Sequence, residues 1–183
     1  MKVLVLALVI GAFVSFAGEA ATAQQQKGDA TVEQKGLGLE LSLVVDKRKY
    51  KPGDELKLQV MLVNPSSKPV YVFRTLDWGV SASLSLHLHN ASGKEIEPEF
   101  PADAQTYDSP DDKSAFVKLG PDHFLGANFP ASIRFLNFSR PGKYSIYVEY
   151  AAPFSNSEVD LKPFFGKENG ILKSNVVWIE VVR

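Results

Sequence analysis

The sequence predicts an all-β protein that folds as an antiparallel β-sandwich, and three observations support this prediction. Two tight-turn signals, Pro52-Gly53 and Pro141-Gly142, each lead into a stretch in which apolar and polar residues alternate with period 2. Several other segments show the same alternation, which is typical of strands with one buried face. After residue 23, no helical periodicity persists for more than a turn or two, so we expect no long helix.

The first strand is predicted at residues 39–45, where leucine or valine occupies every second position. Pro52-Gly53 suits the centre of a type II turn, because proline presets φ and glycine accepts a positive φ. Residues 56–63 then repeat the alternation in the second strand. We expect 64–69 to be a loop, because its two prolines would interrupt a ladder of hydrogen bonds.

The remaining strands follow in order along the chain, at residues 70–73, 81–89, 144–150 and 177–181. The last two alternate most regularly, with tyrosine, isoleucine and valine on one face. Shorter β segments are expected around residues 115–119, 123–125 and 132–135. Between these elements, residues 97–113 form a long loop that is rich in proline and acidic residues, and residues 151–170 form another that contains Pro153, Pro163 and Gly166.

The N-terminus has the layout of a secretory signal peptide over residues 1–23. One basic residue precedes the apolar run Val3–Phe16, and Ala21-Thr22-Ala23 offers small residues at the cleavage site. An uncleaved anchor is the alternative, but the run is short for the roughly 20 apolar residues of a spanning helix. We predict a cleaved signal, a flexible leader over 24–38 and a single domain over 39–183. The product is expected to be secreted or periplasmic, without a membrane span.

The composition excludes several classes of function. With a formal net charge of −1, the chain has no overall field that would attract nucleic acid or an anionic membrane. It has no cysteine, which excludes disulfides, thiolate metal sites and cysteine nucleophiles. The nucleophile-elbow, zinc-helix and phosphate-loop motifs are also missing from the sequence. We therefore predict that the protein is not an enzyme, needs no cofactor and does not bind nucleic acid.

The chain resembles known families at two stretches. One reads Tyr50-x-Pro52-Gly53-Asp54-x-Leu56-x-Leu58-x-Val60, closes at Asn64 and continues to Pro69-Val70. It is similar to the BsuPI-type proteinase-inhibitor domain and to the early strands of macroglobulin-type domains. The other reads Arg140-Pro141-Gly142-Lys143-Tyr144 and is followed by a hydrophobic strand, Ser174-Asn175-Val176 and a final strand. It resembles bacterial exported immunoglobulin-like modules.

These resemblances imply an immunoglobulin-like or fibronectin-III-like sandwich. In such folds a corner tyrosine donates its hydroxyl back to the preceding loop, and Tyr144 holds that position. The first resemblance also implies proteinase inhibition as a function, although the loops at 97–113 and 151–170 have no counterpart in that family.

A histidine pair on the strand at 81–89 is a candidate metal site. His87 and His89 fall on one strand face, and His123 is a possible third ligand. Imidazole nitrogens suit copper or zinc where no thiolate is present. The alternative is a solvent-facing strand that carries two histidines among serines.

Four aromatic residues could form a flat platform for a sugar or a peptide: Tyr71, Phe73, Trp78 and Trp178. The alternative for each is packing in the core or between loops. Trp178 is the strongest of these candidates, because Val177, Ile179 and Val181 occupy the opposite, apolar face of its strand.

The loop at 151–170 holds three further aromatic candidates, Phe154, Phe164 and Phe165, which we expect to be exposed. Aromatic residues on a polar loop either cover a sandwich edge or anchor a partner. The predicted function is therefore an exported, non-enzymatic binding module whose partner is another protein or an envelope component. The alternatives are a BsuPI-like proteinase inhibitor and a periplasmic copper or zinc binder.

Overall fold

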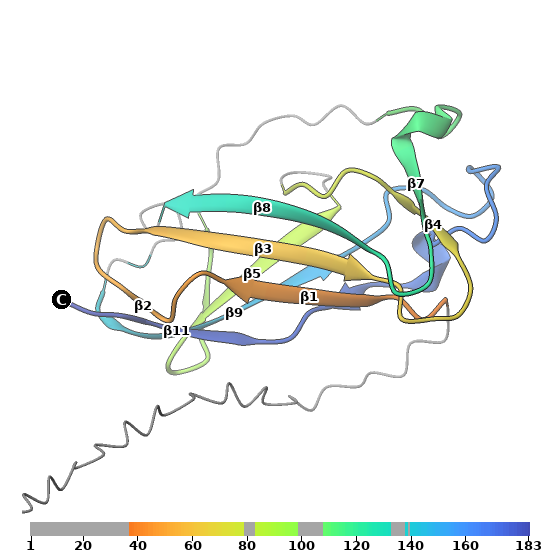
Figure 1. Ribbon diagram of the computed structural model, residues 1–183. Coiled ribbons are helices and arrows are strands. Elements are labelled where there is room, and N and C mark those ends of the chain that lie inside the picture. The colour runs from red at the N-terminus through yellow and green to blue at the C-terminus, as the bar shows by residue number, and fades with distance from the viewer. Residues whose placement is uncertain (1–36, 79–82, 99–107, 133–137, 139) are drawn as a thin grey trace, which may run out of the picture.

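A computed structural model describes residues 37–78, 83–98, 108–132, 138 and 140–183 (Figure 1). The predicted signal peptide and most of the predicted leader lie outside these residues, as does nearly all of the segment expected at 132–135. Leu37, at the end of the segment predicted as a leader, packs against the core. Within the described residues, no helix is long and apolar enough to cross a bilayer.

The described residues form three sheets. The strands in chain order are β1 (Glu40–Val45), β2 (Lys49–Tyr50), β3 (Glu55–Val63), β4 (Val70–Phe73), β5 (Leu84–Asn90), β6 (Glu95–Ile96), β7 (Phe116–Leu119), β8 (Phe124–Ser132), β9 (Gly142–Tyr150), β10 (Leu172–Lys173) and β11 (Val177–Val181). The first sheet has the order β1-β3-β8, the second has the order β2-β11-β9-β5-β6 with β10 beside β9, and the third pairs β4 with β7. Short 3-10 helices occur at Lys113–Ala115 and Lys167–Asn169.

The first and second sheets lie face to face as the two layers of a sandwich (Figure 1). Their inner side chains form one cluster, in which Leu58 of β3 and Ile146 of β9 are almost completely buried. Burial of one such side chain contributes about 1.5–3 kcal/mol. All strand pairs are antiparallel except β2 with β11. The predicted all-β sandwich is confirmed.

The corner tyrosine is also confirmed. The hydroxyl of Tyr144 donates to the carbonyl oxygen of Arg140, four residues earlier, at 2.5 Å. Its ring packs against Phe138 with 4.4 Å between centroids. These contacts fix the loop that leads into β9, the strand that runs through the middle of the second sheet.

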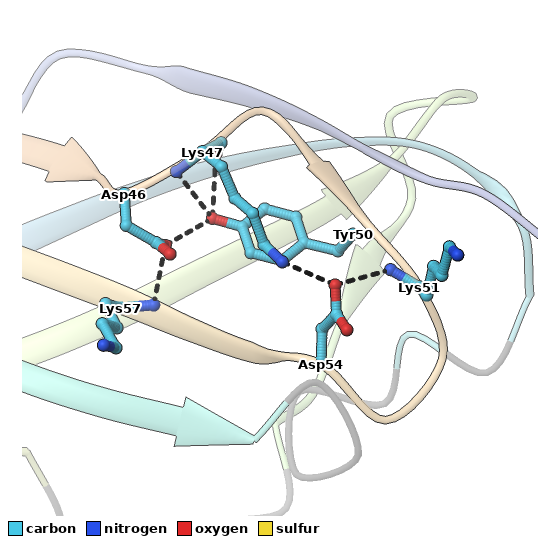
Figure 2. A network of polar contacts seen from close by, with 6 residues as sticks. All are labelled: Asp46, Lys47, Tyr50, Lys51, Asp54 and Lys57. Atoms are coloured by element: carbon cyan, nitrogen blue, oxygen red, sulfur yellow. Dashed lines mark hydrogen bonds and ion pairs between the residues drawn. The ribbon is translucent and has the colours of Figure 1, made fainter.

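The predicted type II turn at Pro52-Gly53 is part of a wider polar network, which Figure 2 shows. The amide of Asp54 donates to the carbonyl of Lys51 at 3.0 Å, and Gly53 has φ of 94°. The Asp54 carboxylate accepts from the amide of Lys51 and from Lys47 Nζ, the latter at 2.6 Å. These hydrogen bonds, that from Lys47 first, lower the pKa of Asp54.

The same network holds the ring of Tyr50 under the β1–β3 connection (Figure 2). Its hydroxyl lies 2.8 Å from Asp46 Oδ1 and from the Lys47 carbonyl oxygen. Burial and the bond to Asp46 raise the pKa of Tyr50. Burial also pushes the pKa of Asp46 upward, but hydrogen bonds from Tyr50 and the Lys57 amide outweigh it and leave that pKa lowered. Each of these contacts stabilises the turn between β1 and β3, so we interpret the network as a contribution to the fold and not as a functional site.

One strand is longer than the sequence indicated. Residues 123–125 and 132–135 were expected as separate short segments, but β8 runs without a break from Phe124 to Ser132. Pro130 is tolerated because β8 is the outer strand of its sheet. Lys57, which lies opposite Pro130, directs its amide and carbonyl toward Asp46 on the β1 side. The missing N–H of Pro130 therefore costs the ladder nothing.

Candidate functional site

The three phenylalanines of the 151–170 loop are buried, which corrects the expectation that they are exposed. Phe154 and Phe164 are 8% and 4% exposed, and they belong to a second apolar cluster. That cluster is completed by Phe73, Ala115, Phe116 and Val159. Phe165 is 2% exposed and packs in the main core, 6.0 Å from the ring of Tyr150. In this conformation none of the three can contact a partner, so they cover an edge of the sandwich instead.

Hydrogen bonds explain why this loop lies against the domain. The amide of Tyr71 on β4 donates to the carbonyl of Pro163 at 2.8 Å, and the amide of Phe165 donates to the carbonyl of Tyr71 at 2.9 Å. The loop thereby extends the β4–β7 sheet by one short bridge. At its other end, the Ser155 amide donates to Glu158 at 2.7 Å, and this bond lowers the pKa of Glu158. The sequence offers no alternating pattern here that could have signalled the bridge.

The two tryptophans have different roles. Trp78 is half-buried, and its ring lies 4.0 Å from that of Phe129 on β8, so it packs against the core as the alternative for it proposed. Trp178 on β11 is 54% exposed. Its neighbours Val177 and Ile179 point inward and are 2% exposed, as the alternation predicted. Of the candidate platform residues, Trp178 is the one that the structure exposes.

Other ring-bearing side chains share the outer face of the second sheet with Trp178. In the strand register, Trp178 lies opposite Ser145 of β9, which in turn lies opposite His89 of β5. Tyr147, which is two residues after Ser145 on β9 and therefore on the same face, lies opposite His87 of β5. We call the surface formed by Trp178, Ser145, His89, Tyr147 and His87 the aromatic face.

The rings of β5 and β9 on this face are stacked nearly parallel. The centroids of His87 and Tyr147 are 4.6 Å apart, with 8° between the ring planes, and those of His89 and Tyr147 are 5.8 Å apart. The ammonium group of Lys173, on β10, lies 3.7 Å from the Tyr147 centroid. Such cation–π contacts are worth about 0.5–1 kcal/mol at exposed sites. The stack fixes the orientation of Tyr147 beside the exposed indole ring.

The histidines of the proposed metal site have other neighbours. His87 Nδ1 lies 3.1 Å from Glu95 Oε1, and His87 Nε2 lies 3.3 Å from Glu149 Oε2. His123 precedes β8 in the other layer, and its Nδ1 lies 2.8 Å from the carbonyl oxygen of Pro121. Nowhere in the described part of the chain do three or more histidines and acidic residues converge as a metal site. The prediction that His123 completes a site with His87 and His89 is therefore wrong, because the two sheets hold them apart.

Cationic side chains border the aromatic face. Arg48 donates from Nη1 to the backbone carbonyl of Trp178 at 3.1 Å, and Lys143 on β9 lies opposite Glu180. Glu180 itself is paired with Lys49 at 3.5 Å. Arg48, Lys143 and Lys173 have no ion pair with any carboxylate of the described residues. Lys173 lies directly opposite Glu149 of β9, so both lysines have a carboxylate across the strand pair, and the border of the face carries charges of both signs.

Neither a protein family nor a curated protein matches the chain. Among solved structures, an alkylpurine DNA glycosylase from Pseudomonas fluorescens bound to DNA with an abasic site analogue is 12% identical, with a TM-score of 0.39. The match covers 81% of this chain but 31% of the glycosylase.

Two further structures match over more of their own length. The CARDB domain of a Pyrococcus furiosus protein in complex with di-metal ions is 14% identical, with a TM-score of 0.36, and the match covers 79% of this chain and 87% of that domain. AvmM, which catalyses macrocyclization in alchivemycin A biosynthesis, is 11% identical, with a TM-score of 0.40 and coverage of 81% and 90%. With TM-scores of 0.40 or below, these likenesses carry no argument about the function of this chain.

Proposed function

We propose that the protein is an exported, non-enzymatic binding module whose binding surface is the aromatic face. The observation that carries this proposal is the exposure of Trp178, at 54%, on a strand within the six-stranded sheet. Tryptophan is a large apolar side chain with one polar group, and it is enriched at the centres of binding surfaces. Here it lies beside a second ring, Tyr147, whose orientation is fixed by stacking.

The proteinase-inhibitor alternative receives no support from the 151–170 loop. An inhibitory loop must offer an accessible, extended segment to a protease. The aromatic residues of this loop are buried, and the backbone of Pro163 and of Phe165 is hydrogen-bonded to the backbone of Tyr71. The export of the protein rests on the N-terminal sequence alone, so the compartment belongs to the proposal as well.

The test compares two exposed aromatic residues on opposite layers. Trp178 lies on the second sheet, and Phe124, which is 62% exposed, lies on the first. The wild-type protein, Trp178→Ala and Phe124→Ala are immobilised and incubated with a native envelope fraction. We expect one component to be retained by the wild type and by Phe124→Ala but lost with Trp178→Ala. Equal retention by all three proteins, or turnover of a substrate by the purified protein, would contradict the proposal.

A further inference from the structure

We infer that the outer edge of β8 pairs with the same edge of a second copy of this chain, so that the two first sheets join into one continuous antiparallel sheet. This inference goes beyond the proposed function and does not rest on it. Three features of the edge support it: its outward backbone groups, its lack of the usual protection and its self-complementary register.

The backbone of β8 presents hydrogen-bonding groups that point away from its own sheet, in which β8 is the outer strand (Figure 1). Lys57 of β3 directs its amide and carbonyl toward β1, so the next residue, Leu58, directs its own toward β8. Leu58 lies opposite Phe129, and the alternation along β8 then turns every second residue outward. The outward backbone groups belong to Phe124, Gly126 and Asn128. Among the described residues, no strand pairs with this side of β8.

The edge lacks the features that keep most edge strands from pairing with another chain. Such strands are usually short, charged or covered. The edge strands of the second sheet, β2 and β6, have two residues each. At the outer edge of β1, the side chain of Asn175 is hydrogen-bonded to the amide and the carbonyl of Leu43. β8 has nine residues, none of which is charged. Of these four edges, that of β8 is the one suited to pairing.

The inward side chains of β8 show that the core is less well covered at this edge. Leu58 and Leu62 of β3 are almost completely buried. Their neighbours on β8 pack against the same cluster but are only half-buried. These neighbours are Leu125, Ala127 and Phe129. A further strand beside β8 would cover them from the open side, and the additional apolar burial would stabilise the pairing.

The edge is self-complementary about Gly126. A two-fold axis at this residue places Gly126 opposite its own copy and Phe124 opposite Asn128 of the second copy. Residues that are opposite each other in this way exchange both backbone hydrogen bonds, so each outward amide meets a carbonyl. On the inner face, Leu125 then lies beside Ala127 of the second copy, and both side chains are apolar.

The ends of this register are compatible with the two chains. Pro130, which has no N–H, comes level with Asp122 of the second copy, where the chain has a φ of 58° and β8 has not yet begun. Lys57 lies opposite Pro130 on β3, so Lys57 and this Asp122 are about two strand spacings of 4.8 Å apart. Both side chains are exposed, and neither is in an ion pair with another described residue. The symmetry therefore brings opposite charges to the same level twice.

Pairing through this edge gives a closed dimer and not a fibre. The outer edge of β1 is occupied by Asn175, so the joined sheet has no second edge that would add a third copy. The aromatic face lies on the other layer and stays exposed in the dimer. Because residues 124–128 form a small interface, we expect the dimer to dissociate on dilution.

The inference is tested by analytical ultracentrifugation of the purified protein over a range of concentrations. We expect a reversible equilibrium between monomer and dimer. Gly126→Glu places two like charges across the axis and should weaken dimerisation about tenfold or more. Its control is Gln59→Glu, which adds the same charge to an exposed position on the central strand β3 and should change dimerisation by less than about twofold. A monomer at every concentration, or equal weakening by the two variants, would overturn the inference.

A crosslinking experiment tests the register, because the chain has no cysteine of its own. Cα atoms of a hydrogen-bonded antiparallel pair are about 5.5 Å apart, which is within the range for a disulfide. Gly126→Cys should therefore form a disulfide-linked dimer on mild oxidation, whereas Gln59→Cys should stay largely monomeric. Circular dichroism checks that each variant is folded, and if Gly126→Glu is not, the crosslinking decides. Equal crosslinking of the two cysteine variants, or crosslinking of neither, would show that the copies do not pair through β8.

Discussion

Two groups of aromatic residues differ in a way that reverses a simple expectation from the sequence. The phenylalanines of the 151–170 loop stand in a polar, irregular segment, yet they are buried. Trp178 stands in a regular apolar strand, yet it is 54% exposed. In the strand, alternation fixes which face a side chain occupies. In the loop no such rule applies, and contacts with residues distant in sequence decide. The position of a residue in the alternating pattern of a strand is thus a better guide to its exposure, and so to a binding surface, than its location in a loop.

The largest expected effect tests the buried side of this comparison. Phe164→Ala removes a ring that packs edge-on against Phe116 at 5.3 Å in the second cluster. Truncation of a buried phenylalanine costs about 3–5 kcal/mol, because the cavity is only partly filled by relaxation. We expect a loss of this size in the free energy of unfolding measured by urea denaturation. A loss below about 1 kcal/mol would show that the loop is not packed as described, and the phenylalanines would again be candidates for partner binding.

A second variant tests the loop backbone. A Cβ atom at Gly166 would lie 2.5 Å from Asn156 Oδ1 and 2.8 Å from the Asn156 amide nitrogen, so the backbone must shift. Gly166→Ala should destabilise the protein by about 1–3 kcal/mol, as overpacking does. It should also speed limited proteolysis within residues 151–170. The control is Gly126→Ala, whose Cβ would first meet the exposed Phe124 ring at an ordinary 3.4 Å. Similar cleavage of both variants would contradict the packed loop.

Much of the fold could be predicted from local sequence patterns. Alternation correctly predicted which residues of β1, β3, β9 and β11 point inward. Side chains alternate between the two faces of a strand, and a register shifted by one residue would turn the apolar side chains to solvent. Turn chemistry placed Pro52-Gly53, and the spacing to Arg140 placed the hydroxyl of Tyr144. Each of these features depends on residues that are close together in the chain.

The features that were missed depend on distant contacts. β8 contains a glycine and a proline, and it is continuous because β3 supplies its whole hydrogen-bonding partner edge. The burial of Phe164 requires the bridge to Tyr71, which no local pattern announces. The aromatic face was found only in part: the prominence of Trp178 followed from alternation, but its position diagonal to Tyr147 follows from pairing of β11 with β9. Tyr147 was not a candidate for this reason.

Two tyrosines of β9 give effects of intermediate size, because the hydroxyl of Tyr144 donates to a backbone carbonyl at the surface loop whereas that of Tyr150 is buried in the core. Tyr144→Phe loses the hydrogen bond to Arg140 and should cost about 0.5–1.5 kcal/mol. The Tyr150 hydroxyl is buried beside the backbone of Phe73. Tyr150→Phe should cost less than Tyr144→Phe in urea denaturation, because it also removes the cost of burying a polar group. A larger loss for Tyr150→Phe than for Tyr144→Phe would contradict this assignment.

Tyr150 also predicts a pH dependence. Burial raises the pKa of its hydroxyl above the ordinary 10.0, since the phenolate would be charged in an apolar interior. The native state thus holds the proton more tightly than the unfolded state does. Its contribution to stability is complete below pH 10 and is lost as the pH rises toward the native pKa. Between pH 9 and pH 11, the unfolding midpoint of Tyr150→Phe should fall less than that of the wild type. Parallel curves would indicate that the hydroxyl is not buried.

The smallest expected effect on stability belongs to the residue with the largest proposed role in binding. Trp178→Ala should change the free energy of unfolding by no more than about 0.5 kcal/mol, as surface substitutions do. Its indole is half exposed, and the inward side of β11 is held by Val177 and Ile179. A loss of about 2 kcal/mol or more in urea denaturation would show that the indole supports the sheet, and its exposure would then no longer indicate a ligand. A small loss of stability, together with weakened binding, would show that Trp178 contributes to ligand binding and not to the stability of the fold.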